Sequence, residues 1–221
     1  MRNIYYLILI ALISQSCIGT DIVDDYVEAR VSINNPIQSL KVDNSYQFMA
    51  TYLNNIGAPE LAGFQWESSD ENVLQIDNEG NVLGLKKGES TITVSAHDVS
   101  DSLVLSISDT TIGSVNERIA VLKTVSTYPL GGNAILKRAG GKTILEFDES
   151  FNTTSALPGL YVYLTNNVST INNAFEVAKV KEFTGAQSYE LEEDISITKY
   201  DFVLFYCKPF LVPVGNGELK P

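Results

Sequence analysis

The fold of the N-terminal half is decided by the stretch Phe64-Gln65-Trp66-Glu67-Ser68-Ser69-Asp70-Glu71-Asn72-Val73-Leu74-Gln75-Ile76-Asp77, which continues as Gly80-Asn81-Val82-Leu83-Gly84-Leu85-Lys86-Lys87-Gly88 and closes with Ser90-Thr91-Ile92-Thr93-Val94. Its short apolar runs alternate with polar residues and are separated by turn residues, a pattern that predicts half-buried β-strands. Trp66 is the single tryptophan of the chain, and a tryptophan in an alternating strand is expected in the core. The stretch therefore predicts an all-β sandwich.

Strand signals continue on both sides of this stretch. Tyr46, Phe48, Ala50 and Tyr52 would share one face of a strand, because side chains two apart point the same way. Residues Ser102 to Ser108 alternate as cleanly. No sustained helical periodicity occurs after the first residues of the chain, so we expect strands throughout.

The order of four features resembles the group-two bacterial immunoglobulin-like domain. They are the tryptophan, the double serine Ser68-Ser69, the turn glycine Gly80 and the final strand Ser90 to Val94. The resemblance covers residues 29–108 and implies an immunoglobulin-like β-sandwich. Members of this family are commonly spacers or adhesive modules of bacterial surface proteins, so we expect a spacer here.

The C-terminal half, residues 118–221, also alternates. It comes after a polar segment, residues 109–117, which we interpret as a linker. Glycine-containing turns separate candidate strands at Ile119 to Thr124, Asn133 to Lys137, Thr143 to Phe147, Leu160 to Leu164, Ala174 to Val180, Gln187 to Leu191 and Asp201 to Cys207. The fold class we predict is thus all-β, an immunoglobulin-like sandwich followed by a second β-sandwich or barrel-like domain.

Several segments of this half resemble one family, the DM13 domain. They are Tyr128-Pro129-Leu130-Gly131-Gly132, Thr143-Ile144-Leu145-Glu146-Phe147, Ser155-Ala156-Leu157-Pro158-Gly159-Leu160-Tyr161-Val162-Tyr163-Leu164, Phe183-Thr184-Gly185-Ala186-Gln187-Ser188-Tyr189 and Tyr206-Cys207-Lys208-Pro209-Phe210. The resemblance implies an electron-transfer domain that acts through the cysteine of the terminal motif. It makes Cys207 the candidate redox thiol.

The residues around Cys207 leave its role open. Both faces of the strand from Phe202 to Cys207 are apolar, so alternation does not say whether the thiol is buried. A buried cysteine behaves as a small, inert hydrophobic residue, whereas a reactive one needs exposure and a positive neighbour. Lys208 is the next residue, but adjacent strand residues point to opposite faces. A dithiol exchanger would need a second cysteine.

The first residues predict export. Met1-Arg2-Asn3 is charged, Ile4 to Ile13 is apolar but too short for a permanent span, and Ser16 precedes Cys17. This order resembles a bacterial lipoprotein signal, residues 1–16, and implies acylation, including palmitate, at Cys17. The alternative is an ordinary signal peptide cut nearby, which would leave Cys17 a plain thiol. A Cys17–Cys207 disulfide would then close almost the whole chain.

The segment after Cys17 is rich in acidic residues, and we interpret residues 17–28 as an acidic tether. Before the first basic residue after Cys17, Arg30, the chain carries four acidic residues, Asp21, Asp24, Asp25 and Glu28. This pattern fits either a solvated tether or an address for the cell surface. We expect an exported lipoprotein anchored in the outer membrane, on its periplasmic or cell-surface side.

Charge and composition exclude several functions. The formal net charge of −12 disfavours nucleic acid as a partner, so membrane contact would rest on the lipid at Cys17. The single histidine, His97, cannot form a metal site alone, and common triad hydrolases are excluded. We expect no metal, no cofactor and no conventional enzyme.

Two hypotheses remain. In the first, Cys207 exchanges electrons or a disulfide with an unknown envelope partner. In the second, the two β domains form a non-enzymatic binding or adhesion lipoprotein in which Cys207 is structural.

Overall fold

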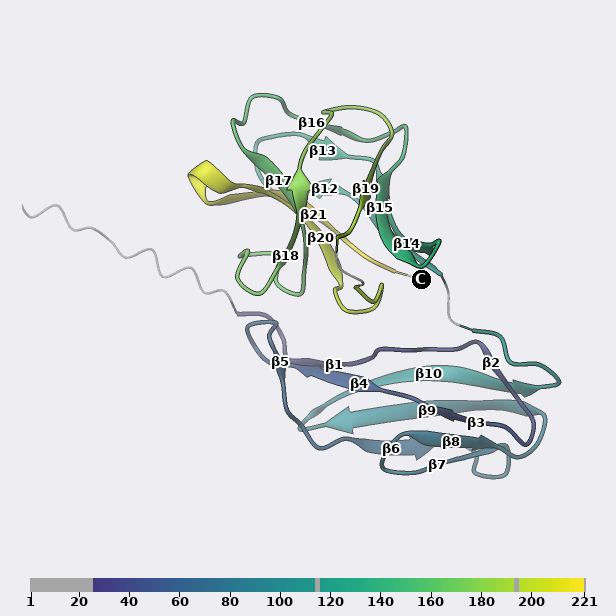
Figure 1. Ribbon diagram of the computed structural model, residues 1–221. Coiled ribbons are helices and arrows are strands. Elements are labelled where there is room, and N and C mark those ends of the chain that lie inside the picture. Colours follow the sequence, from purple (N-terminus) through teal and green to yellow (C-terminus); the bar gives the residue numbers. More distant parts are fainter. Residues whose placement is uncertain (1–25, 114–115, 193–194, 221) are drawn as a thin grey trace, which may run out of the picture.

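The computed structural model describes residues 26–113, 116–192 and 195–220. These residues form two β domains in series, the first drawn in purple to teal and the second in teal to yellow (Figure 1). This arrangement confirms the predicted fold class.

The strands of the first domain form three sheets in the described residues. Their elements, in sheet order, are β1 (Arg30–Ile33), β4 (Ala50–Leu53) and β5 (Pro59–Glu60); β2 (Ser39–Lys41), β10 (Val99–Ser108), β9 (Gly88–Ala96) and β6 (Gln65–Ser68); and β3 (Ser45–Gln47), β8 (Asn81–Gly84) and β7 (Leu74–Ile76). The long β9–β10 hairpin is antiparallel, whereas β2 pairs with β10 in parallel.

Trp66 lies in the core of this domain, as its position in the sequence predicted. It is buried in β6 and its ring lies 6.2 Å from that of Phe48, between centroids. The turn before β8 closes against the same aromatic pair. Gly80 has φ of +80°, and a Cβ there would lie 2.5 Å from the carbonyl oxygen of Phe48. Glycine is therefore required at this turn.

The alternation from Tyr46 to Tyr52 is confirmed, but the expected single strand is divided. Phe48 is fully buried and Tyr46, Ala50 and Tyr52 pack against the same core. However, β3 pairs with β8 whereas β4 pairs with β1. The chain changes sheets at Phe48 and keeps its inward face, which allows one alternating segment to serve two sheets.

The second domain is a β-sandwich, one of the two predicted alternatives. One sheet contains β11 (Glu117–Val121), β14 (Asn133–Ala139), β15 (Lys142–Phe147) and β19 (Gln187–Glu190). The other contains β12 (Lys123–Thr124), β21 (Val212–Glu218), β20 (Phe202–Cys207), β17 (Leu160–Thr165) and β18 (Phe175–Lys179), while β13 (Leu130–Gly131) pairs with β16 (Asn152–Thr153). A 3-10 helix, η1 (Lys208–Phe210), joins β20 to β21.

Stacked aromatic rings fill the space between the two large sheets. The centroids of Phe147 and Phe151 are 4.6 Å apart, and Phe205 lies 5.4 Å from Phe147 and 5.7 Å from Phe151. All three are buried. Strand β20, which carries Phe205, pairs with β17 and β21 and is therefore central in its sheet.

The sequence did not predict β21. Its residues Val212 to Glu218 contain Pro213, Gly215 and Gly217, which normally indicate a loop. A Cβ at Gly215 would lie 2.3 Å from the carbonyl oxygen of Lys123. The glycine is present because the neighbouring backbone approaches closely.

Candidate functional site

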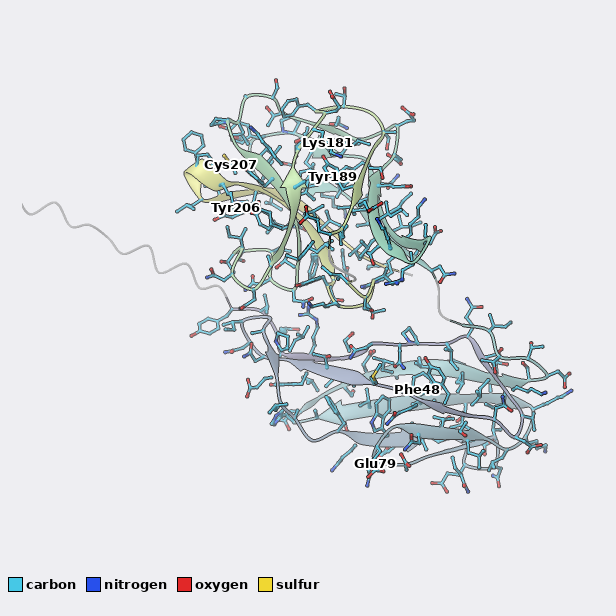
Figure 2. The ribbon with its side chains drawn as sticks, in the orientation of Figure 1. Phe48, Glu79, Lys181, Tyr189, Tyr206 and Cys207 are labelled. Atoms are coloured by element: carbon cyan, nitrogen blue, oxygen red, sulfur yellow. The ribbon has the colours of Figure 1, made fainter. Side chains whose placement is uncertain are left out.

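Cys207 lies in the core of the second domain. It is the last residue of β20, opposite Leu160 of β17 and Val212 of β21, and its exposed fraction is 0%. It belongs to the same buried cluster as Phe205 and is a free thiol. Figure 2 places it at the end of the strand, where the chain turns into η1.

The burial of Cys207 settles what the alternation left open. Its side chain packs as a small hydrophobic group, and no attacking sulfur can reach it without local opening. Lys208 does not supply a positive neighbour, because its ammonium pairs with Glu176 of β18 and lies 4.5 Å from the ring centroid of Tyr161. Tyr161 faces the other side of the sheet from the cluster that contains Cys207.

That other side carries a second, smaller cluster, which we call the tyrosine face. Tyr163 and Leu204 are buried on neighbouring strands, and Tyr206 packs beside them with its ring edge-on to that of Tyr163, 6.3 Å between centroids. Tyr161 and Ile171 cover it in part. Strand β20 is thus buried on both faces, which explains its apolar sequence.

A phenol and a carboxylate meet on the tyrosine face. The hydroxyl of Tyr163 donates a hydrogen bond of 2.9 Å to Oε2 of Glu176, and the same oxygen lies 2.5 Å from Nζ of Lys208. A β-bulge produces this geometry. Val162 pairs with Ala178 but Tyr163 pairs with Glu176, so Val177 is an extra residue that brings Glu176 directly opposite Tyr163.

The charges of this trio are tuned by their contacts. Burial raises the pKa of Tyr163 well above its ordinary value, and the hydrogen bond to Glu176 and its negative charge raise it further. Burial alone would raise the pKa of Glu176, but hydrogen bonds from Lys208 and Tyr163 outweigh burial and lower that pKa. The hydrogen bond to Glu176 raises the pKa of Lys208. Near neutral pH the phenol is neutral and the other two groups are charged.

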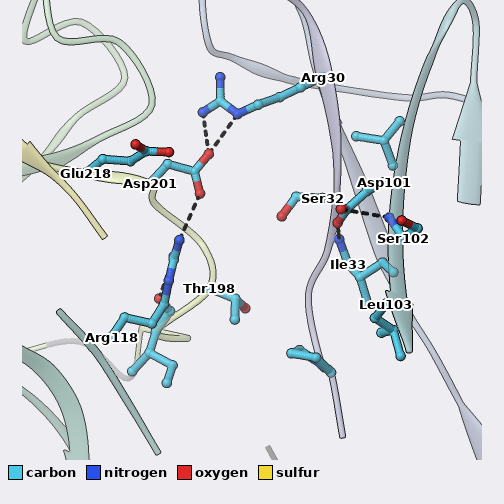
Figure 3. Close-up of a pocket in the computed structure, with 13 residues that line it drawn as sticks. Arg30, Ser32, Ile33, Asp101, Ser102, Leu103, Arg118, Thr198, Asp201 and Glu218 are labelled. Atoms are coloured by element: carbon cyan, nitrogen blue, oxygen red, sulfur yellow. Dashed lines mark hydrogen bonds and ion pairs between the residues drawn. The ribbon is translucent and has the colours of Figure 1, made fainter. Parts of the chain in front are cut away.

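A second group of polar residues lies between the domains, shown in Figure 3. Arg30 of β1 contacts Oδ2 of Asp201 through Nε at 2.7 Å and through Nη2 at 2.6 Å. Arg118 of β11 approaches Oδ1 of Asp201 at 3.4 Å and donates to the carbonyl oxygens of Ile197 and Tyr200. One carboxylate therefore holds an arginine from each domain.

At least three cavities border this joint. The first, of about 390 Å³, is lined among others by Arg30, Asp101 and Glu218. The second, of about 470 Å³, has hydroxyl and amide groups from both domains, including Ser32 and Asn166, beside the apolar Leu53. Both volumes are in the range of small-molecule sites, which often lie at domain interfaces.

Two other residues were singled out in the sequence, Cys17 and His97. Cys17 and the rest of the proposed signal lie outside the described residues. His97 is exposed at the β9–β10 turn with φ of +52°, and its ring packs against that of Tyr52 in a tilted arrangement, 4.8 Å between centroids. Within the described ranges, no cluster of potential metal ligands occurs, and no helix there has the length and hydropathy to cross a membrane.

Two groupings were missed by sequence reasoning. Arg30 and Asp201 are 171 positions apart, and nothing in either neighbourhood indicates the pairing. Tyr163 and Glu176 lie on adjacent strands, but their register depends on a bulge that no turn residue marks.

Each half of the chain matches a known protein-family model. Residues 29–107 match the model described as "Bacterial Ig-like domain (group 2)", and residues 124–219 match the model "Electron transfer DM13". The chain contains an Ig-like domain followed by a DM13 domain. This confirms the two resemblances and their order. Asp201 and the tyrosine face thus belong to the DM13 domain, whereas Arg30 belongs to the Ig-like domain.

Individual relatives add little. An uncharacterized protein of Clostridium acetobutylicum is 30% identical over 117 residues, which is 46% of this chain and 28% of that protein. The chain therefore spans little more than a quarter of this curated relative. The solved structure of domains 5–6 of the S-layer protein SbsC aligns over 88% of this chain and 97% of that one, at 12% identity. Its TM-score of 0.32 is too low to support an argument.

Proposed function

We propose that this chain is a lipid-anchored cell-envelope protein whose DM13 domain passes single electrons to or from an envelope partner, with the Ig-like domain as its spacer. The match of residues 124–219 to an electron-transfer family carries the proposal. The lipoprotein-like start of the sequence supports export and an acyl anchor at Cys17.

The burial of Cys207 favours single-electron transfer over thiol exchange. Thiol–disulfide exchange requires one sulfur to attack another directly, and Cys207 has no exposed surface. An electron does not need such contact, because it can tunnel over a short distance through packed side chains. The described residues also offer no second thiol within the chain.

The reactivity of Cys207 tests this mechanism. In the folded chain without its signal, we expect iodoacetamide to alkylate Cys207 only after denaturation, as read by mass spectrometry. Cys207→Ala should keep the fold and keep electron exchange with a small photo-oxidant. Rapid labelling of the native chain, together with loss of electron exchange in Cys207→Ala, would instead support Cys207 as the redox-active residue.

The anchor has its own test. Cells that express the full chain should incorporate labelled palmitate into it and retain it in the outer-membrane fraction. Cys17→Ser should abolish both, whereas Cys207→Ser should change neither. Palmitate incorporation that survives Cys17→Ser would exclude this anchor.

A second candidate function is supported by the cavity of about 470 Å³ between the domains. In this alternative the protein is a surface-binding lipoprotein and Cys207 is structural. Saturable binding of purified envelope polysaccharide should then persist in Cys207→Ala. Ser32→Trp, which fills the cavity, should remove that binding, whereas Ser45→Trp on exposed β3 should not. Binding unaffected by Ser32→Trp would reject this candidate.

A further inference from the structure

The tyrosine face of the DM13 domain contains the features that one-electron oxidation of a phenol requires. A neutral phenol loses an electron readily only if its proton leaves at the same time, since the protonated radical is a strong acid. The proton needs an acceptor at hydrogen-bond distance. Tyr163 has such an acceptor in Glu176, at 2.9 Å.

We propose that Tyr163 is the electron-donating residue of this domain and that Glu176 receives its proton. The inference rests on the electron-transfer function proposed above and names the residue that performs it. Tyr163 is 2% exposed, so bulk water does not compete with Glu176 for the phenolic proton.

Atoms and electrons balance in this step. A one-electron acceptor removes one electron from Tyr163, the phenolic O–H bond breaks, and the proton moves to Oε2 of Glu176. The products are the neutral tyrosyl radical, the protonated carboxyl group and the reduced acceptor. Return of an electron and of the same proton restores Tyr163, so the cycle consumes nothing within the protein.

Lys208 prepares Glu176 for this role. Its ammonium lies 2.5 Å from the same carboxylate oxygen that accepts the hydrogen bond of Tyr163, which keeps Glu176 deprotonated before oxidation. The charged or titratable groups that face Tyr163 come from β17, β18, β20 and η1. They are Tyr161, Glu176, Tyr206 and Lys208.

The tyrosine face also gives an electron a short route to a partner. The side chains of Lys208 and Glu176 are 40% and 41% exposed, so the buried ring of Tyr163 lies one side chain away from solvent. The edge-on contact with Tyr206 extends the aromatic path along β20. A partner that docks on this face would approach Tyr163 without opening the core.

Tyr189 and Tyr46 differ from Tyr163 in the atom that accepts their hydroxyl hydrogen bond. The hydroxyl of Tyr189 donates to the amide oxygen of Gln187 at 2.6 Å, and that of Tyr46 donates to the backbone oxygen of Asn35 at 3.0 Å. Amide oxygens are far weaker bases than a carboxylate. Tyr189 also lies under the ammonium of Lys181, 4.4 Å from the ring centroid, which disfavours a positive charge on the ring. Tyr189 and Lys181 are labelled in Figure 2.

Flash photolysis of the full chain with ruthenium(III) trisbipyridine as the oxidant tests the inference. Transient absorption and electron paramagnetic resonance detect the phenoxyl radical. Tyr163→Phe should remove the long-lived radical. Glu176→Gln keeps the phenol and a hydrogen-bond acceptor but removes the base, so oxidation should slow about 100-fold. Tyr46→Phe, which removes a half-buried phenol of the Ig-like domain, is the control and should behave as wild type.

The outcomes separate the two levels of the proposal. A radical that persists in Tyr163→Phe, or a rate unchanged in Glu176→Gln, overturns the role of Tyr163 while electron transfer by the domain still stands. A folded wild-type chain that reacts no faster than the urea-unfolded chain overturns both. Circular dichroism of each variant shows that the fold is retained, and loss of a solvent isotope effect in Glu176→Gln would identify the proton transfer.

Discussion

Arg30 and Asp201 join the two domains through one ion pair of 2.6 Å. Arg30 is the first residue of β1 in the Ig-like domain, and Asp201 immediately precedes β20 in the DM13 domain. Asn166 strengthens the contact, because its side-chain oxygen accepts a hydrogen bond from Arg30 and another from the backbone of Asp201. The relative position of the domains depends on these side chains together with two further hydrogen bonds across the joint, donated by Thr198 and Asn167.

Arg30→Ala should uncouple the domains. The pair is only partly exposed, so its loss is expected to cost about 1 kcal/mol of coupling, and calorimetry should show two separate unfolding transitions. Lys87→Ala is the matched control, because the Lys87–Asp109 pair is exposed and lies within the Ig-like domain and linker. One unchanged transition in Arg30→Ala would show that other contacts hold the joint.

Gly215→Ala should destabilise the DM13 domain. A Cβ at this position would lie 2.3 Å from the carbonyl oxygen of Lys123, so β12 and β21 would have to separate. We expect a loss of about 1–3 kcal/mol in urea denaturation. Gly63→Ala meets no atom within 4 Å and should be neutral. Equal midpoints for the two variants would contradict the close approach.

Acid should weaken the tyrosine face through Glu176. Its pKa is lowered in the folded state, because hydrogen bonds from Lys208 and Tyr163 outweigh the opposing effect of burial. The stability it contributes is therefore complete above its ordinary pKa of 4.5 and falls as the pH drops below that value. Urea denaturation from about pH 6 to about pH 3 should show a smaller acid loss in Glu176→Gln. The same loss in both chains would show that Glu176 is not responsible.

Three tyrosines should ionise only in strong alkali. Burial raises the pKa values of Tyr163, Tyr189 and Tyr46 above the ordinary 10.0, so their neutral forms stabilise the fold below about pH 10 and that stability is lost above it. Ultraviolet titration of the native chain should show these three phenols ionising above the ordinary value. In urea their ionisation should move down to that value, and an unchanged titration in urea would contradict the burial of these phenols.

Local patterning predicted most strands of the DM13 domain within one or two residues. Thr143 to Phe147 was expected and β15 is Lys142–Phe147; Leu160 to Leu164 was expected and β17 is Leu160–Thr165. These strands have one face in the core and alternate accordingly. The burial of the Cys207 thiol could not be predicted in this way, because β20 is buried on both faces. A strand without a polar face shows no alternation.

Contacts that depend on three-dimensional register could not be predicted. The pairing of Tyr163 with Glu176 is caused by one extra residue in β18, and a slip of one residue would have placed Glu176 elsewhere. The Arg30–Asp201 pair depends on how the two sandwiches pack against each other. Neither residue type nor spacing in the sequence indicates that packing.

The place where the Ig-like domain begins limits how far the two domains can lie from an anchor at the start of the chain. Arg30 contacts the DM13 domain directly, so the chain enters the Ig-like domain at its junction with the DM13 domain and not at its far end. If Cys17 carries the proposed lipid anchor, the 13 residue steps from Cys17 to Arg30 limit the distance between the lipid and this junction to about 45 Å when fully extended.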